Sequence, residues 1–239
     1  MCAREPCAGL LDGSCYDTGH SHKFLYQLHD RRFCPCWRTN YIFLNSNIFR
    51  TLHHLVVSSA DLVLKRIQEY AQRRWLPIIG PEKGRILADV IRRHHPKRIL
   101  EVGTLVGYSA IIMGREVERG GEIITIEIDE NAAETACRNI QEAGLSDIVK
   151  VVAGDAVSII PQLDGFFDMV FLDAVKHQYL TYLKLVEDRL GEGAVIVADN
   201  VGWSSYSMRD FLDHVRKSGK YKSEYISVAG DGMEISVKQ

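Results

Sequence analysis

Oxygen-bearing side chains stand at the ends of several short apolar runs in this sequence. The residues concerned are Glu127, Asp155, Asp173 and the adjacent pair Asp199 and Asn200. A purely structural sheet does not need a carboxylate at the end of each strand, so this repetition indicates a ligand site. Ligands of parallel sheets bind beyond the carboxyl ends of the strands, where these side chains would gather.

Asp173, Asp199 and Asn200 offer three oxygen donors at the ends of two strands that should be neighbours. Oxygen ligands without nitrogen or sulfur suit Mg²⁺, or Mn²⁺ or Ca²⁺ in its place. Three protein ligands would leave coordination positions for water and for two adjacent substrate oxygens. An Asx turn that opens a loop is the alternative interpretation of the Asp199-Asn200 pair.

Two glycines, Gly103 and Gly107, flank a loop between an apolar run at 98–102 and a helical pattern at 104–117. Gly103 permits a sharp turn and the close approach of a ligand, and Gly107 lets the helix pack near the strand. A dinucleotide fingerprint needs glycine where Leu105 stands, so NAD and FAD are disfavoured. A tight turn without any ligand is the structural alternative.

Glu127 lies 24 positions after Gly103, about the separation at which an acidic side chain reaches the two hydroxyls of a ribose. A ribose without a pyrophosphate indicates S-adenosylmethionine. Gly103 and Thr104 would then lie near its methionine part, and Asp155 and Ala156 near its adenine. A solvated carboxylate at a strand end is the alternative for Glu127.

The elements that position these residues follow a regular order. Strands are predicted at 98–102, 122–127, 149–153, 168–173 and 194–199, and helical stretches at 104–117, 130–143, 156–162 and 177–190. This alternation predicts an α/β fold with a doubly wound, mostly parallel, Rossmann-like sheet. After a helix at 205–218, strands at 221–228 and 233–237 flank the turn Ala229–Gly232, so about seven strands should end in an antiparallel pair.

A change of composition near residue 50 predicts two parts, a loosely ordered extension at 1–50 and a catalytic domain at 51–239. The domain should begin with helices at 59–74 and 83–94, the first ended by Pro77 and Pro81. Five of the six cysteines fall within the first 36 residues, so disulfide bonds cannot cross-link the domain internally. A zinc site is the alternative interpretation of Cys34 and Cys36 with His20, His22 and His29.

The whole-chain composition favours a folded, soluble, cytoplasmic protein with a small-molecule ligand. The sequence is 46% hydrophobic, and its formal net charge of −2 gives no reason to expect a nucleic-acid or membrane partner. No apolar run approaches the roughly 20 residues that a membrane-spanning helix needs. A homodimer is left open.

Residues 75–237 resemble the cation-dependent O-methyltransferases, the family that includes catechol O-methyltransferase and the caffeoyl-CoA O-methyltransferases. The matching stretches are residues 80–84, 100–103, 107–110, 124–127, 160–163, 168–173 with Lys176 and Tyr179, and 198–201. Each stretch is a weak signal alone, but their order and spacing together make chance agreement improbable.

The resemblance implies a role for individual residues. Ile79, Glu101, Gly103 and Ser109 would line the methionine end of the cofactor, Glu127 would bind the ribose, and Asp155 or Ala156 would lie at the adenine. Asp173 is also expected among the cofactor-binding residues. Asp173, Asp199 and Asn200 match the family's metal ligands, and Lys176 its general base. Trp75 matches an aromatic wall over the substrate, and we also expect Trp203 near the substrate.

The resemblance is incomplete in two places. Ala174 and Val175 stand where catechol O-methyltransferase has a His-Trp pair, so the adenine pocket resembles that of the bacterial and plant members more. At the acceptor, only Glu224 lies near the position of the family's hydroxyl-binding acid. His177 is a rival base to Lys176, but in a helix its side chain would point about 100° away.

The expected function is metal-dependent methyl transfer from S-adenosylmethionine to a hydroxyl of a small catechol-like or vicinal-diol acceptor. The alternatives are a non-catalytic or metal-independent S-adenosylmethionine-binding protein, or another nucleotide-cofactor enzyme on the same sheet.

Overall fold

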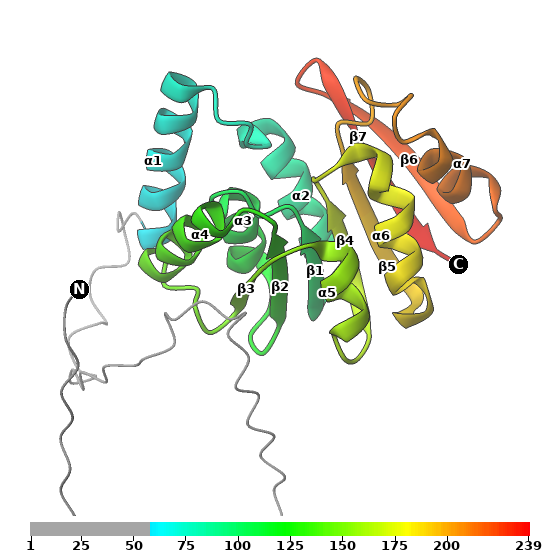
Figure 1. Cartoon of the computed structure of the whole chain (residues 1–239), viewed down its shortest axis with the longest axis horizontal. Coiled ribbons are helices and arrows are strands. Elements are labelled where there is room, and N and C mark those ends of the chain that lie inside the picture. The colour runs from blue at the N-terminus through cyan, green and yellow to red at the C-terminus, as the bar shows by residue number, and fades with distance from the viewer. Residues whose placement is uncertain (1–57) are drawn as a thin grey trace, which may run out of the picture. The chain divides into compact units, whose positions relative to one another are not determined.

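A computed structural model of the chain describes residues 58–239. Its strands are β1 (Arg98–Val102), β2 (Glu122–Glu127), β3 (Val149–Ala153), β4 (Phe167–Leu172), β5 (Leu190–Asp199), β6 (Tyr221–Val228) and β7 (Asp231–Lys238). They form one sheet in the order β3-β2-β1-β4-β5-β7-β6 (Figure 1). The first five strands pair in parallel, whereas β7 is antiparallel to both β5 and β6. The predicted fold class is confirmed.

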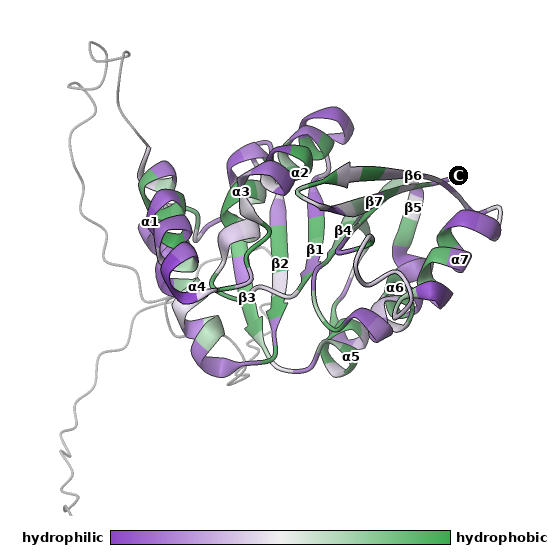
Figure 2. Cartoon of the chain, turned by 90° about the horizontal axis from the view of Figure 1, so that it is seen from above, coloured by the Kyte–Doolittle hydropathy of each residue, from purple (hydrophilic) through white to green (hydrophobic). Residues whose placement is uncertain are grey.

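Helices cover both faces of this sheet (Figure 2). They are α1 (Ser59–Arg74), α2 (Gly80–His94), α3 (Tyr108–Glu116), α4 (Glu130–Glu142), α5 (Ala156–Ile159), α6 (Tyr179–Val186) and α7 (Arg209–Lys217), with 3₁₀ turns η2 (Ile160–Gln162), η3 (Lys176–Gln178) and η4 (Glu187–Arg189). Buried residues of α1 to α4 pack in one core and those of α5 to α7 in the other. The sheet is therefore the middle of three layers.

Strand β4 shows why the sequence specifies two cores. Met169 and Phe171 face the core under α1 to α4, while Val170 and Leu172 face the core under α5 to α7. All four side chains are fully buried. Successive side chains of a strand point to opposite faces, so a continuous apolar run is stable only between two covering layers.

Helix α1 begins and ends as predicted, but Pro81 has a different role. Ser58 and Asp61 form a reciprocal capping box at the start of α1, and Trp75 ends it in the left-handed conformation, at φ 53°. Pro81 does not end α1, because it lies in the first turn of α2, which starts at Gly80 rather than Lys83. Proline fits a first helical turn, where its missing N–H has no intrahelical partner.

Two boundary differences affect the edge of the sheet at which the parallel strands end. The helix expected from residue 104 begins only at Tyr108, after Gly107 at φ 86°, so the chain from Gly103 to Gly107 is a loop. The expected turn Ala229–Gly232 is shorter, because Asp231 and Gly232 already belong to β7. Asp231 therefore begins a strand at this edge.

A polar cluster joins α6, α7 and β6 at a distance from that edge. The Glu187 carboxylate, at the start of η4, accepts hydrogen bonds from His214 Nε2 (2.6 Å), Tyr221 Oη (2.8 Å) and Lys184 Nζ (2.7 Å). The Glu187 side chain is 7% exposed. Burial alone would raise the pKa of Glu187, but these partners lower it to about 2.

The helices of residues 58–239 are all too short or too polar to cross a membrane. The predicted extension at 1–50 and its zinc alternative lie outside the described residues. The domain division stays a prediction.

Candidate active site

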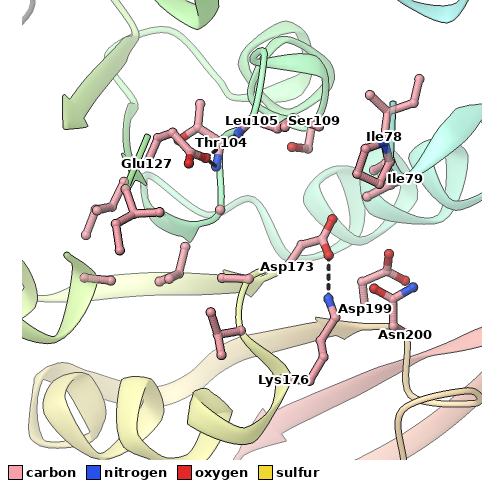
Figure 3. Close-up of a pocket in the computed structure, with 18 of the residues that line it drawn as sticks. Ile78, Ile79, Thr104, Leu105, Ser109, Glu127, Asp173, Lys176, Asp199 and Asn200 are labelled. Carbon is pink, nitrogen blue, oxygen red and sulfur yellow. Dashed lines mark hydrogen bonds and ion pairs between the residues drawn. The ribbon is translucent and has the colours of Figure 1, made fainter. Parts of the chain in front are cut away.

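A cavity of about 710 Å³ opens where the parallel strands end. Loops after β1 to β5 form most of its wall, and the segment between α1 and α2 and the β6–β7 turn complete it. Figure 3 shows Glu127 with Thr104 and Leu105 at one end of the cavity, and Asp173, Lys176, Asp199 and Asn200 together at the other.

Glu127 organises the glycine loop after β1. Its Oε2 accepts hydrogen bonds from the backbone N–H groups of Thr104 (3.1 Å) and Leu105 (2.7 Å), and its Oε1 accepts one from the N–H of Asp129 (3.0 Å). A carboxylate offers about four acceptor positions, so these contacts leave capacity for ligand hydroxyls. Leu105 lines the cavity in the left-handed region, at φ 50°.

Gly103 brings two loops of the site together. Its φ of 100° is rarely adopted by other residues, and a Cβ atom there would collide with the carbonyl oxygen of Asp173. The backbone N–H of Asp173 in turn donates to the carbonyl of Val102 (2.9 Å). Glycine at position 103 therefore sets how closely the β1 and β4 loops approach.

Glu101 lies behind the cavity wall. It is 0% exposed, its Oε1 accepts a hydrogen bond from the hydroxyl of Ser109, and its Oε2 has no partner. Burial, reinforced by the charges of Asp173 and Glu127, raises the pKa of Glu101 to about 8. Ser109 lines the cavity and Glu101 does not, so any effect of Glu101 on a ligand would pass through Ser109.

Lys176 occupies the other end of the cavity. Its Nζ donates to Asp173 Oδ1 (2.8 Å) and to Tyr179 Oη (2.8 Å). Tyr179 is fully buried at the start of α6, so its hydroxyl is a fixed anchor. The short turn η3 thus presents the Lys176 ammonium beside a carboxylate and a rigid phenol.

Two charged residues that we did not predict in the site, Lys83 and Asp231, lie beside Asp199. Lys83 Nζ is 2.5 Å from Asp199 Oδ1 and 2.8 Å from Asp231 Oδ2. Burial and the charge of Asp173 raise the pKa of Asp199, against the opposing effect of Lys83. Burial would also raise the pKa of Asp231, but hydrogen bonds from Lys83, Trp203 and Asn200 lower it to about 2.

Most of the predicted site residues do line the cavity. They are Ile79, Gly103, Thr104, Ser109, Glu127, Asp155, Ala156, Asp173, Lys176, Asp199, Asn200 and Trp203. Glu101, Trp75, His177 and Glu224 are not among the lining residues. Trp75 is 93% exposed, so its predicted place over the substrate would require Trp75 to move.

The donor set fits a hard divalent cation. Asp173, Asp199 and Asn200 present only oxygen donors, and Asp199 Oδ1 is buried with the Lys83 ammonium 2.5 Å away. Oxygen ligands of this kind suit Mg²⁺, Mn²⁺ and Ca²⁺. Among residues 58–239, no group of three or more His, Cys, Asp or Glu side chains is arranged to hold a metal, and this set has only two such side chains with one amide.

The sequence contained a signal for each missed residue. Lys83 stands four residues before Leu87 and seven before Val90, so it falls on the buried stripe of α2. Asp231 lies two residues before the strand predicted at 233–237, and that strand belongs to the antiparallel pair. The first residue of an antiparallel strand lies at the same sheet edge as the last residues of the parallel strands.

Comparisons with known proteins identify the family of this chain. The O-methyltransferase family model matches residues 56–223, and the chain belongs to the O-methyltransferase family. Catechol O-methyltransferase of Bos taurus is 36% identical over 184 residues, 74% of this chain and 67% of that protein. Catechol O-methyltransferase of Niastella koreensis is 36% identical over 167 residues, 66% of this chain and 76% of that protein.

Solved structures extend the comparison to the cofactor. The O-methyltransferase from Bacillus cereus in complex with SAH is 27% identical with a TM-score of 0.69, covering 75% of this chain and 91% of that one. TomG from Streptomyces achromogenes, solved in complex with SAM, is also 27% identical, with a TM-score of 0.67 over 79% of this chain and 92% of that one. The predicted class, an S-adenosylmethionine-dependent O-methyltransferase, is confirmed.

Proposed function

We propose that the protein methylates one hydroxyl of a small acceptor that carries two adjacent hydroxyls, as a catechol does. Asp173, Asp199 and Asn200 would hold a divalent cation, Mg²⁺ or in its place Mn²⁺ or Ca²⁺. The observation that carries the proposal is the position of Lys176, whose Nζ lies 2.8 Å from Asp173 Oδ1 at the end of the cavity that also holds Asp199 and Asn200. The catechol O-methyltransferases among the relatives support the acceptor class.

The other end of the cavity would bind the cofactor. Glu127 keeps acceptor positions for the ribose hydroxyls while it holds the glycine loop. Asp155 and Ala156 line the wall at the end of β3, where we place the adenine. Ser109 and Ile79 would contact the methionine part, between the ribose and the acceptor.

The cation supplies Lewis acidity that lowers the pKa of an acceptor hydroxyl. Lys176 in its neutral form takes the proton of that hydroxyl onto Nζ, and Tyr179 Oη holds Nζ in place. The acceptor oxygen would then attack the methyl carbon in line, so that an O–C bond forms while the C–S bond breaks and the cofactor leaves as a neutral thioether. Trp203, 78% exposed at the cavity wall, would cover the acceptor.

Methyl transfer from labelled S-adenosylmethionine to catechols, flavonoids and hydroxycinnamoyl thioesters tests the proposal. We expect turnover with at least one vicinal-diol acceptor, and loss of that turnover in excess EDTA with cofactor binding retained. Full turnover in EDTA would support a metal-independent transferase. Tight cofactor binding with no turnover on any acceptor, metal present, would support a binding protein.

The cellular setting is part of the same proposal. We propose a cytoplasmic enzyme of small molecules that needs neither a nucleic acid nor a membrane, consistent with the net charge of −2. Light scattering after gel filtration would determine whether it forms the homodimer that the sequence leaves open.

A further inference from the structure

A buried cluster of charges includes the proposed metal ligand Asp199, and the proposed reaction gives no role to its other two members, Lys83 and Asp231. Lys83 comes from α2, Asp199 from the end of β5 and Asp231 from the start of β7, so three separate elements meet here. These residues are 5%, 2% and 5% exposed. Charged side chains are almost never buried so deeply unless they are paired, and each of these has a partner of opposite charge.

Asp231 is the acceptor at the centre of the cluster. Its Oδ2 accepts hydrogen bonds from Lys83 Nζ (2.8 Å) and Asn200 Nδ2 (2.9 Å), and its Oδ1 accepts one from the backbone N–H of Trp203 (2.8 Å). An ionised carboxylate only accepts hydrogen bonds, so it fixes the amide nitrogen of Asn200 on its own side. Asn200 Oδ1, the atom that could bind a cation, is left free of Asp231.

The loop that carries Asn200 is shaped to lie against Asp231. Asn200 has a left-handed backbone, at φ 62°. A Cβ atom on Gly202 would be 2.7 Å from Asp231 Oδ1 and 3.1 Å from its carbonyl carbon, so only glycine fits without displacement. The N–H of Val201 also donates to the carbonyl of Gly232, next to Asp231 (3.0 Å). The loop after β5 therefore packs closely against the start of β7, with Val201 and Gly202 in contact with residues 231 and 232.

Lys83 has a separate effect on Asp199. Its Nζ is 2.5 Å from Asp199 Oδ1, so the Asp199 carboxylate has a cationic neighbour inside the protein. The same ammonium donates to Asp231 Oδ2. The Lys83 ammonium thus offsets the negative charges of Asp199 and Asp231, which would otherwise repel each other in the low-dielectric protein interior.

We propose that Asp231 is a positioning residue of the metal site, which acts by orienting the Asn200 amide toward the cation while Lys83 holds the two aspartates. This inference rests on the proposed function for the identity of the ligands. Groups that hydrogen-bond to metal ligands typically change metal affinity by about 10- to 100-fold when they are removed.

Binding of Mn²⁺ to the full chain, loaded with S-adenosylmethionine and without acceptor, tests the proposal by electron paramagnetic resonance. Asp231→Asn should bind Mn²⁺ roughly 10- to 100-fold more weakly. The substitution replaces one carboxylate oxygen by an amide nitrogen, which cannot accept a hydrogen bond from Lys83, Asn200 or Trp203. Asp213→Asn, a change on α7 at a half-exposed carboxylate that forms an ion pair with Lys217, is the control and should leave the affinity unchanged.

A double-mutant cycle asks whether Asp231 acts through Asn200. Asn200→Ala should weaken Mn²⁺ binding, and adding Asp231→Asn to it should cause little further loss, because the amide to be oriented is gone. Additive losses would overturn the proposal and assign Asp231 a purely electrostatic effect.

Three further outcomes are decisive. Wild-type protein that fails to bind Mn²⁺ overturns the proposed metal dependence and this inference with it. If the wild-type protein binds Mn²⁺ and Asp231→Asn binds it equally well, only the inference is overturned.

If circular dichroism shows that Asp231→Asn is unfolded, Gly202→Ala takes its place, since it displaces Asp231 without removing a polar group. Several-fold weaker Mn²⁺ binding then supports the proposal, and unchanged binding overturns it.

Discussion

Lys176 shows how a single side chain can be held ready for proton transfer. Tyr179 and Asp173 each lie 2.8 Å from its Nζ, and the buried ring of Tyr179 cannot follow a movement of the lysine. A positioned general base contributes about 10²- to 10⁴-fold in rate. We therefore expect Lys176→Ala to lose turnover by that factor while its affinity for S-adenosylmethionine stays close to that of wild type.

The pH profile separates loss of a base from loss of structure. Part of the activity of Lys176→Ala should return at high pH, where hydroxide can remove the acceptor proton. Steady-state kinetics from pH 7 to 10 and calorimetric cofactor binding measure both effects. Lys222→Ala, an exposed change on β6, is the matched control. Near-normal turnover of Lys176→Ala at neutral pH would exclude Lys176 as the base.

Glu101 gives a prediction about stability rather than rate. Burial raises its pKa to about 8 in the folded protein, whereas an unfolded glutamate titrates near 4.3. Because the unfolded chain ionises first, the contribution of Glu101 is full below about pH 4.3 and declines as the pH rises to 8. Glu101→Gln, which carries no ionisable group there, should be relatively more stable at pH 8 than at pH 5.

Thermal melts of wild type and Glu101→Gln across this range test the sign of the effect. The difference in melting temperature between the two proteins should move in favour of Glu101→Gln as the pH rises. Glu130→Gln, at an exposed position in α4, should show no such trend. A difference that is constant from pH 5 to pH 8 would mean that Glu101 ionises in the folded protein as it does in the unfolded chain.

At the scale of elements, Glu187 links the helix layer of α6 and α7 to the outer strand β6. Its partners lower its pKa to about 2, so its stabilising effect is full above about pH 4.5 and is lost as the pH falls toward 2. Glu187→Gln should lower the free energy of unfolding at pH 7 by about 1–3 kcal/mol. The free energy of unfolding of this variant should also fall less than that of wild type as the pH is lowered from about 4.5 toward 2. Urea melts at pH 7 and pH 3 measure this effect, with the exposed Glu192→Gln as control.

If Glu187→Gln lost as much stability as wild type between pH 7 and pH 3, Glu187 would not be a source of the acid sensitivity. The loss at pH 7 should also shrink in a Tyr221→Phe background, because Tyr221 Oη donates to the same carboxylate at 2.8 Å.

The parallel part of the sheet was predictable because both of its faces are buried. Strands such as β4 are continuous apolar runs whose ends carry the site residues, so finding the strands also found Asp173 and Asp199. Gly103 was predictable for a similar reason, since few residues other than glycine adopt its φ of 100°. Local sequence decides both features.

Lys83 and Asp231 were missed because their place depends on tertiary structure. A lysine on the buried stripe of a helix is stable only opposite carboxylates from other elements, and the sequence does not show which elements those are. Placing Asp231 required knowledge that β7, and not β6, lies beside β5. Trp75 shows the same limit, because its 93% exposure depends on how α1 ends.

At the scale of the whole molecule, the described residues that build the two cores begin at Ala60, and the sequence before residue 50 lacks a periodic apolar pattern. We therefore expect a chain without residues 1–50 to fold with an unchanged melting temperature and to retain methyl transfer. Circular dichroism and the labelled-cofactor assay measure these two properties. A truncated chain that binds S-adenosylmethionine but has lost turnover would make residues 1–50 part of the acceptor site, contrary to the predicted domain division.

The position of β7 between β5 and β6 has a consequence for synthesis on the ribosome. Strand β6 emerges before β7 but reaches the sheet only through it. The strands that carry the glycine loop and Glu127 need no later segment to pair with each other. The nascent chain can thus assemble its nucleoside half early, whereas the cluster around Lys83 is complete only when Asp231, its second carboxylate partner, has been made. The order of translation therefore makes the acceptor half the last part of the enzyme to form.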